Sequence, residues 1–232
     1  SHYFTGIGNE FDRPNVFTRW LIDTFGFEAY IEINDRFQII TVMHQGYDWV
    51  TWLQTNDRGQ VHTGKMMRYE LVDGQPKRMK KGYTQDWIHK VWLTKEQQKQ
   101  FTYTQSLIGS TALRRHPDKA VCIVESEKTA VIATIFHPEN IWLSVGGASN
   151  LVAYNNSCSI MAPVKNRRII LVADDNQRED WTKHCKTLQL NGFSVKMAED
   201  LTTLGWQVEK GADLADYLLQ SPEMDKLRWK KK

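Results

Sequence analysis

Four short apolar runs alternate with helical segments in the second half of the chain, and this alternation restricts the possible fold more than any other feature. The runs cover residues 120–124, 141–145, 168–173 and 193–197. Helices are expected over residues 127–136, from about residue 149, and over 179–189 and 213–219. Strands this apolar are buried on both faces, which is typical of a parallel sheet covered by helices. We therefore predict an α/β domain with a parallel four-stranded sheet and flanking helices over residues 116–232.

The first half of the chain has a different pattern. Runs at 29–33, 37–43 and 47–53 are rich in β-branched and aromatic residues, and Asn34-Asp35, Gln45-Gly46 and Asp73-Gly74 supply turn residues near them. One helix is expected before these runs, with Asn15 as its N-cap and Gly26 at its end. Residues 1–115 are thus predicted to form a mainly antiparallel α+β subdomain.

Composition excludes several classes of protein. None of the apolar runs among the 232 residues approaches the roughly 20 residues of a membrane span, and the N-terminus does not resemble a signal peptide. The three cysteines form no C-x-x-C pair, which fits a reducing cytoplasm better than a disulfide framework or a zinc ribbon. The net charge of +3 does not require a nucleic-acid partner. The sequence therefore favours a cytoplasmic protein without membrane contact.

Acids and glycines follow the predicted parallel strands. Glu125 comes after the first, Gly146-Gly147 after the second and Asp174-Asp175-Asn176 after the third, and two further acids lie downstream. Ligands of open parallel sheets bind beyond the carboxyl ends of the strands, where several carboxylates repel one another unless a cation lies among them. Mg²⁺ prefers such oxygen ligands. The predicted site for Mg²⁺, or Mn²⁺, consists of Glu125, Asp174, Asp175, Asn176, Asp213 and Asp216.

The local geometry of this site can also be anticipated. If the chain stays extended after the third strand, Asp174 and Asn176 share a face and Asp175 points away. Gly146 and Gly147 would let the backbone approach a ligand closely. For each acid taken alone, helix capping is an alternative explanation. The joint arrangement of all of them favours a metal site.

These motifs together resemble a Toprim domain, the metal-binding module of bacterial primases, topoisomerases and some nucleases. Residues 124–130 (VESEKTA) are similar to the Glu-Gly-Glu-Lys form of plasmid and phage primase-like proteins, and residues 211–217 (GADLADY) resemble a downstream acidic motif of the same group. The resemblance covers about 118–220. Segments 61–69 and 86–89 also resemble Toprim-containing proteins of bacterial mobile elements.

The resemblance implies roles for individual residues. Glu125 would be a general acid/base or would organise the metal, and Asp174 would be the first acid of the D-x-D motif. Asn176 stands at the second acidic position, and this departure would weaken metal binding unless Asp175, Asp213 or Asp216 compensates. Glu125 and Asp174 are therefore the predicted catalytic residues.

Basic residues provide candidate contacts to nucleic acid. The predicted set is Lys65, Arg68, Lys77, Arg78, Lys80, Lys81 and Lys128. For Lys65 and Arg68 the alternative is an ordinary polar strand face, for residues 77–81 a solvated turn, and for Lys128 an ion pair with a nearby acid. Trp49, Trp52, Trp87 and Trp92 could stack on bases, although core packing is the favoured interpretation.

The function expected from this resemblance is that of a primase-like protein of a mobile element, with Mg²⁺-dependent nucleotidyl transfer. DNA or RNA is the expected partner, together with a replication protein such as a helicase. A Toprim nuclease is one alternative, with the same metal site and with water or a side chain as the nucleophile. Tyr154 and Tyr217 are available, but no nucleophile stands out in the sequence. A non-catalytic scaffold that binds nucleic acid or a replication partner is another.

Overall fold

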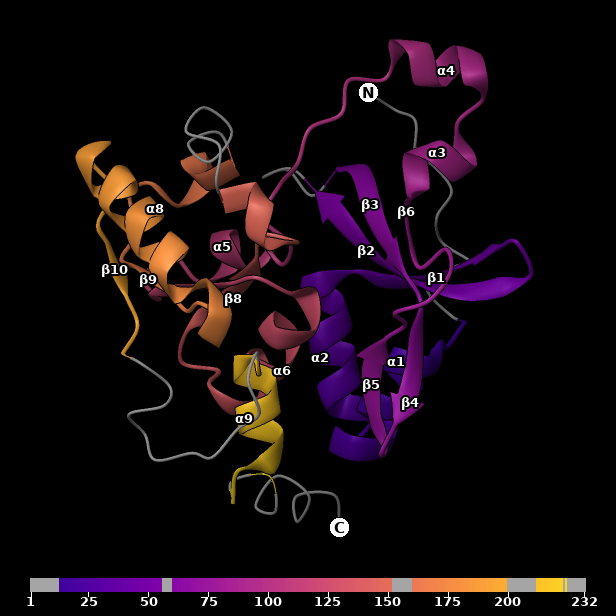
Figure 1. Ribbon diagram of the computed structural model, residues 1–232, viewed down its shortest axis with the longest axis horizontal. Helices are drawn as coiled ribbons and strands as arrows, with labels where there is room; N and C mark the ends of the chain where they lie inside the picture. Colours follow the sequence, from indigo (N-terminus) through magenta and orange to yellow (C-terminus); the bar gives the residue numbers. More distant parts are fainter. Residues whose placement is uncertain (1–12, 56–59, 152–159, 200–211, 223, 225–232) are drawn as a thin grey trace. The chain divides into compact units, whose positions relative to one another are not determined.

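The computed structural model describes residues 13–55, 60–151, 160–199, 212–222 and 224 (Figure 1). The chain divides into two compact units, Ser1–Ser106 and Leu107–Lys232. The division into functional domains at residue 115 stays a prediction.

The first unit begins with two helices. Asn15 caps α1 (Val16–Phe25), because its side chain accepts hydrogen bonds from the backbone N–H groups of Phe17 and Thr18. Gly26, with φ of 94°, ends α1 as expected and leads directly into α2 (Phe27–Phe37). The strand and turn predicted over residues 29–35 are therefore wrong. Ile33 and Phe37 are buried while Ile31 is 50% exposed. A strand would place Ile31 and Ile33 on the same face, whereas a helix separates them and keeps Ile33 and Phe37 together.

An antiparallel sheet follows. Its strands are β1 (Ile39–His44), β2 (Tyr47–Thr55), β3 (Val61–Met67) and β6 (Gln85–Trp87), in the order β1-β2-β3-β6. The strands β4 (Tyr69–Val72) and β5 (Gln75–Arg78) form a separate hairpin. Both hairpin turns have two residues with positive φ, Gln45-Gly46 and Asp73-Gly74, and this geometry matches the twist of the strands they join. The helices α3 (Ile88–Trp92) and α4 (Lys95–Gln100) complete the unit.

Aromatic packing fills the core of this unit. Trp49 and Trp52 are fully buried, so the core interpretation is confirmed for these two residues. The ring of Phe17 on α1 meets that of Trp52 at 5.1 Å between centroids, which fastens the first helix to the sheet. Trp87 and Trp92 are only half-buried.

The second unit contains the predicted parallel sheet. Its strands are β7 (Val121–Val124), β8 (Ile141–Ser144), β9 (Ile169–Leu171) and β10 (Val195–Met197), and all neighbours pair in parallel. The described helical segments are α5 (Ala112–Arg115), α6 (Glu127–Phe136), η2 (Ala148–Leu151), η3 (Ala162–Val164), η4 (Asp175–Gln177), α8 (Arg178–Leu190) and α9 (Leu214–Gln220). The fold class predicted from the sequence is thus confirmed. In the described ranges we find no helix with the length and apolar character needed to cross a membrane.

The strand order β10-β9-β7-β8 decides where a ligand can bind in this unit. Helix α6 joins β7 to β8 in one direction, and α8 joins β9 to β10 in the opposite direction. Because parallel crossovers are right-handed, the two helices cover opposite faces of the sheet. The order therefore reverses between the adjacent strands β7 and β9, and ligands of such sheets bind beyond the carboxyl ends of the strands at this point.

We predict that Asn15→Ala destabilises the protein by about 1–3 kcal/mol, because it removes a helix cap and a buried hydrogen bond. The Asn15 side chain also donates to Thr41 Oγ1 at 3.0 Å, so it ties α1 to β1. Urea denaturation followed by circular dichroism would measure the loss.

Thr94→Ala is the matched control, since Thr94 forms a capping box on α4, a helix without buried residues. That variant should lose less than about 0.5 kcal/mol, because α4 can fray without opening the core. Equal losses in the two variants would contradict this account of Asn15.

Candidate metal and nucleic-acid site

Glu125 and Asp174 lie together at the point where the strand order reverses. Glu125 follows β7 and Asp174 follows β9, and the two strands are paired from Val121↔Ile169 to Ile123↔Leu171. The Val172 N–H donates to the Ile123 carbonyl at 2.9 Å and extends this pairing toward the site. The side chains of Glu125 and Asp174 are joined by a hydrogen bond. The structure thus brings together the two predicted catalytic residues.

The environment of Asp174 favours its protonated form. Burial, followed by the nearby carboxylates of Asp213, Glu125 and Asp216, raises the pKa of Asp174 to about 8. A carboxyl group that holds its proton at neutral pH indicates a place where negative charge is in excess. A cation bound there would relieve that repulsion.

Two further acids, Asp213 and Asp216 at the start of α9, lie near Asp174. Asp213 is the N-cap of α9 and forms a reciprocal capping box with Asp216, in which each backbone N–H donates to the other side chain. The Thr129 hydroxyl on α6 donates to Asp213 Oδ2 at 2.7 Å. Asp213 and Asp216 therefore cap α9 and at the same time add negative charge near Asp174. Residue 211 of the predicted acidic motif lies outside the described residues.

Lys128 contributes a cation to this group of acids. Its Nζ lies 3.3 Å from Asp216 Oδ1 and 3.8 Å from Asp213 Oδ2. The ion-pair alternative for Lys128 is therefore what the structure shows, and its contact to nucleic acid stays a prediction. The ammonium group compensates the charge of the α9 acids, while Glu125 and Asp174 share a hydrogen bond instead.

Asp175 and Asn176 do not join the cluster in the expected way. The chain is extended at Asp174 but turns at once into η4, with the Gln177 N–H donating to the Asp174 carbonyl at 2.9 Å. Both Asp175 and Asn176 are exposed. The extended backbone assumed for these residues is therefore wrong, and Asp174 is the member of the motif that enters the cluster.

The glycines after β8 lie beside the same strand ends. Gly146 and Gly147 have φ of 76° and 148°, conformations that side chains disfavour. The Ser144 hydroxyl donates to the Glu125 carbonyl at 2.8 Å and accepts from the Gly146 N–H at 2.9 Å. This bridge holds the end of β7 against the glycine turn.

Sequence reasoning missed Glu127, Ser144 and Thr129 as members of this site. Glu127 lies in the first turn of α6 and is buried, and a Cβ placed on Gly146 would lie 3.4 Å from its Oε1. The signal in the sequence was its spacing of two residues from Glu125. Ser144 and Thr129 carried no such signal, because only the fold places their hydroxyls against these groups.

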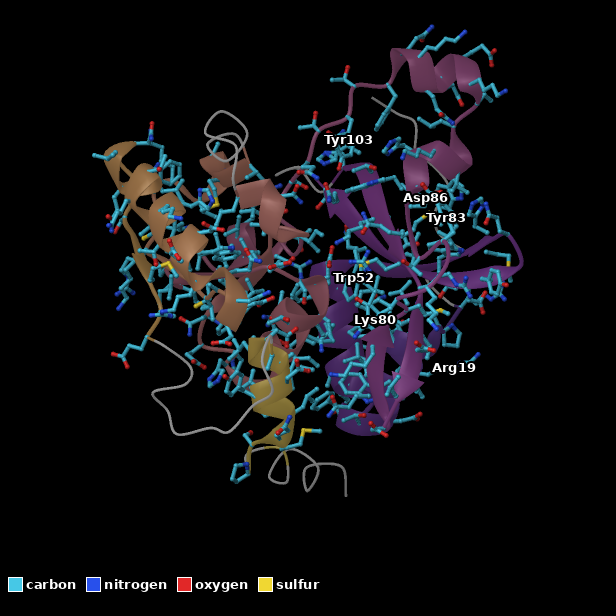
Figure 2. The ribbon with its side chains drawn as sticks, viewed as in Figure 1. Arg19, Trp52, Lys80, Tyr83, Asp86 and Tyr103 are labelled. Carbon is cyan, nitrogen blue, oxygen red and sulfur yellow. The ribbon has the colours of Figure 1, made fainter. Side chains whose placement is uncertain are left out.

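The predicted basic contacts of the first unit differ in exposure. Arg78, Lys80 and Lys81 are exposed on β5 and the turn after it (Figure 2 labels Lys80), and Lys77 is half-buried. Arg68 lies over the ring of Tyr47, 3.6 Å from its centroid. Lys65 is only 5% exposed, so this structure does not display it to a partner. The roles of all these residues in binding stay predictions.

The donor set fits a divalent metal that is completed by a substrate. Within the described ranges, no three His, Cys, Asp or Glu side chains form a ready-made metal site. Mg²⁺ commonly uses one or two carboxylates, several waters and substrate phosphates, and the adjacent carboxyl groups of Glu125 and Asp174 meet that requirement. The crowding of acids around Asp174 is the feature that a metal would relieve.

Comparison with known proteins places the chain in one family. The model of the family described as a domain of unknown function (DUF6371) matches residues 15–175, which reach from the cap of α1 to the start of η4. No curated protein matches the chain in sequence.

Solved primase structures share this fold. The E. coli primase catalytic core has a TM-score of 0.52 at 14% identity, over 96% of this chain and 75% of that chain. The primase fragment of the bacteriophage T7 primase–helicase protein also has a TM-score of 0.52 at 14% identity, over 86% of this chain and 69% of that chain. A third match is a chain from the complex of T7 lagging-strand DNA polymerase with primase domains bound to an RNA/DNA hybrid and dTTP. Its TM-score is 0.51 at 14% identity, over 85% of both chains. The chain therefore has the fold of primase catalytic cores, which fits the Toprim-like sheet predicted above.

The raised pKa of Asp174 predicts a pH dependence of stability in the presence of a chelator. Between the ordinary carboxyl pKa of 3.8 and about 8, the folded protein holds a proton that the unfolded chain releases. The free energy of unfolding therefore falls as pH rises through this range. Asp174→Asn removes the repulsive charge, and we expect it to stabilise the protein at pH 9 by about 1 kcal/mol or more.

Denaturant unfolding at pH 6 and pH 9 would measure this effect. Asp175→Asn is the matched control, because it removes a neighbouring carboxylate that is exposed. If Asp175→Asn stabilised the protein at pH 9 as much as Asp174→Asn does, general surface charge would explain the effect and the cluster would not.

Proposed function

Because the chain belongs to the DUF6371 family, described as a domain of unknown function, we propose its activity from its own site: primase-like, Mg²⁺- or Mn²⁺-dependent nucleotidyl transfer on a nucleic-acid template. The observation that carries this proposal is the meeting of Glu125 and Asp174 at the β7/β9 strand ends, with the pKa of Asp174 raised to about 8. The fold of primase catalytic cores supports the same assignment.

In this proposal Glu125 and Asp174 hold the metal, with Asp213, Asp216 and the exposed oxygens of Asp175 and Asn176 as further candidate ligands. The metal would orient a substrate phosphate and stabilise the charge that develops on it. Glu125, which already shares a hydrogen bond with Asp174, is placed to accept or return a proton as a general acid/base. Lys128 and Thr129 fix the positions of Asp213 and Asp216 by ion pairs and a hydrogen bond.

The glycine turn would supply backbone groups to a ligand. Gly146 and Gly147 have positive φ, which other residues disfavour, so no side chain lies between a ligand and the main chain at these two positions. A nucleotide phosphate at the strand ends could therefore come close to the main chain at this turn.

Nucleic acid is the proposed partner of the first unit. Arg68, Lys77, Arg78, Lys80 and Lys81 would contact its phosphates, as sequence-independent contacts do. One similar structure is a primase fragment of a primase–helicase protein, so a helicase is included in the proposal as a replication partner. Origin from a mobile element and cytoplasmic location are proposed on the sequence alone.

The nuclease alternative has less support from the described residues. Tyr154 lies outside them, and Tyr217 is only 3% exposed on α9. No observation therefore provides the nucleophile that strand cleavage with a covalent step would use. The scaffold alternative is distinguished by metal binding, which it does not require.

We expect the chain to incorporate labelled ribonucleotides on single-stranded DNA in the presence of Mg²⁺ or Mn²⁺. Asp174→Ala and Glu125→Ala should each lower the rate by about 100-fold or more, as losses of groups that stabilise developing charge do. Electrophoresis of the labelled products would measure the rate. Cleavage of the template without incorporation would support the nuclease instead.

Metal binding predicts a rise in thermal stability. Ligand at a hundredfold excess over Kd stabilises the folded state by about 2.7 kcal/mol, so the melting temperature should rise when millimolar Mg²⁺ or Mn²⁺ is added. The rise should disappear in Asp174→Ala. Glu199→Ala is a control with an exposed acid elsewhere in the unit and should keep it. A parent chain that shows neither a shift nor incorporation would favour the scaffold.

A further inference from the structure

Four aromatic rings gather at one place on the first unit. They belong to Trp87, His89, Phe101 and Tyr103, here called the ring cluster. His89 and Phe101 are stacked at 4.7 Å between centroids and 21° between planes, and Tyr103 meets Trp87 edge-on at 5.0 Å. His89 also lies 5.3 Å from Tyr103. The cluster therefore joins the end of β6 and the start of α3 to the chain segment after α4.

This cluster is not part of the hydrophobic core. One core cluster of this unit consists of Ile40, Val42, Trp49, Leu53, Met66 and Ile88, with Val61, Val91 and Trp92 packed against it. The four rings are absent from that set. Tyr103 is 42% exposed, and Figure 2 shows it on the segment that follows α4. Trp87, His89 and Phe101 are half-buried.

Hydrogen bonds hold the rings in place. Thr63 Oγ1 on β3 lies 2.8 Å from His89 Nδ1, and the Gln105 side chain donates to the Tyr103 hydroxyl at 2.9 Å. Burial, and then the charge of Lys90, lowers the pKa of His89, so its ring is neutral at pH 7. A neutral, anchored ring loses little freedom when a flat group stacks on it.

The chain segment that carries the ring cluster has several exposed lysines, while the buried Asp86 on β6 also acts on His89. Between residues 88 and 103 the chain carries Lys90, Lys95 and Lys99, and a single acid, Glu96. All four are exposed. Helix α4 carries three of them and has no buried residue, so its side chains lie on the surface. Partly exposed rings and exposed lysines in one chain segment are the two kinds of group that bind a single-stranded nucleic acid, since bases stack on rings and phosphates pair with ammonium groups.

We propose that the ring cluster, with Lys90, Lys95 and Lys99, binds single-stranded nucleic acid by stacking on its bases. A single strand is favoured over a duplex because the bases of a duplex are already stacked on one another. One part of the inference rests on the proposed function, namely that the bound strand is the template. Binding to the cluster does not require the metal site.

Fluorescence anisotropy of labelled oligothymidylate with the full chain in EDTA would test this proposal. Tyr103→Ala should raise Kd at least about fivefold, the effect of losing one base–ring stack. Tyr103→Phe, which keeps the ring, should stay within about twofold of the parent. Phe27→Ala is the matched control, because Phe27 is 61% exposed on α2 of the same unit. It should also stay within about twofold.

Salt dependence separates stacking from charge. Replacing Lys95 and Lys99 by Ala should reduce the slope of log K against log salt, whereas Tyr103→Ala should leave that slope unchanged. A duplex of the same length should bind more weakly than the single strand and should not respond to Tyr103→Ala.

Several results would overturn the inference. They are a parent chain that does not bind the oligonucleotide, a Tyr103→Ala variant that binds as the parent does, and a Phe27→Ala variant that is weakened equally. Ribonucleotide incorporation by the parent is measured separately. If incorporation is absent while Tyr103 still governs binding, the proposed function fails and the inference stands. If incorporation depends on Asp174 while Tyr103→Ala binds normally, the reverse holds.

Discussion

Repulsion among carboxylates at the ends of β7 and β9 is the constraint around which the second unit is arranged. Asp174 avoids a full negative charge because burial and the neighbouring acids raise its pKa to about 8. Asp213 and Asp216 are compensated by Lys128, and Asp213 also accepts from Thr129. Helix packing supplies these partners, since α6 carries Lys128 and Thr129 and α9 carries the two acids. A site that holds this much unfavourable charge is suited to a cation that arrives with its substrate.

The parallel sheet makes this arrangement unavoidable. The apolar strands β7 and β9 have to be buried between helices, and their adjacency brings their carboxyl ends together. The residues that follow, Glu125 and Asp174, then meet although they are far apart in the chain. The Ser144 hydroxyl links the β7 end to the glycine turn, so the backbone around the acids is fixed by the same sheet.

In the first unit, different residues form the core and the exposed surface. Its largest rings, Trp49 and Trp52, fill the core, while Arg78, Lys80 and Lys81 remain on the surface of β5 and its following turn. The ring cluster around Tyr103 is a third kind of region, aromatic yet outside the core. Two surfaces of one unit thus carry the groups that phosphates and bases would contact.

The sequence by itself determined the parallel sheet, the antiparallel strands after residue 37, the Asn15 cap and the pairing of Glu125 with Asp174, because each follows from local periodicity or from the rule that parallel strands end at one edge. Only the tertiary structure decided that residues 29–35 are helical, since packing buries Ile33 and Phe37 but leaves Ile31 exposed, against the strand-like alternation. It also turned Asp175 and Asn176 outward through η4 and paired Lys128 with the α9 acids. The ring cluster depends on contacts between β6, α3 and the segment after α4, so no local pattern could reveal it.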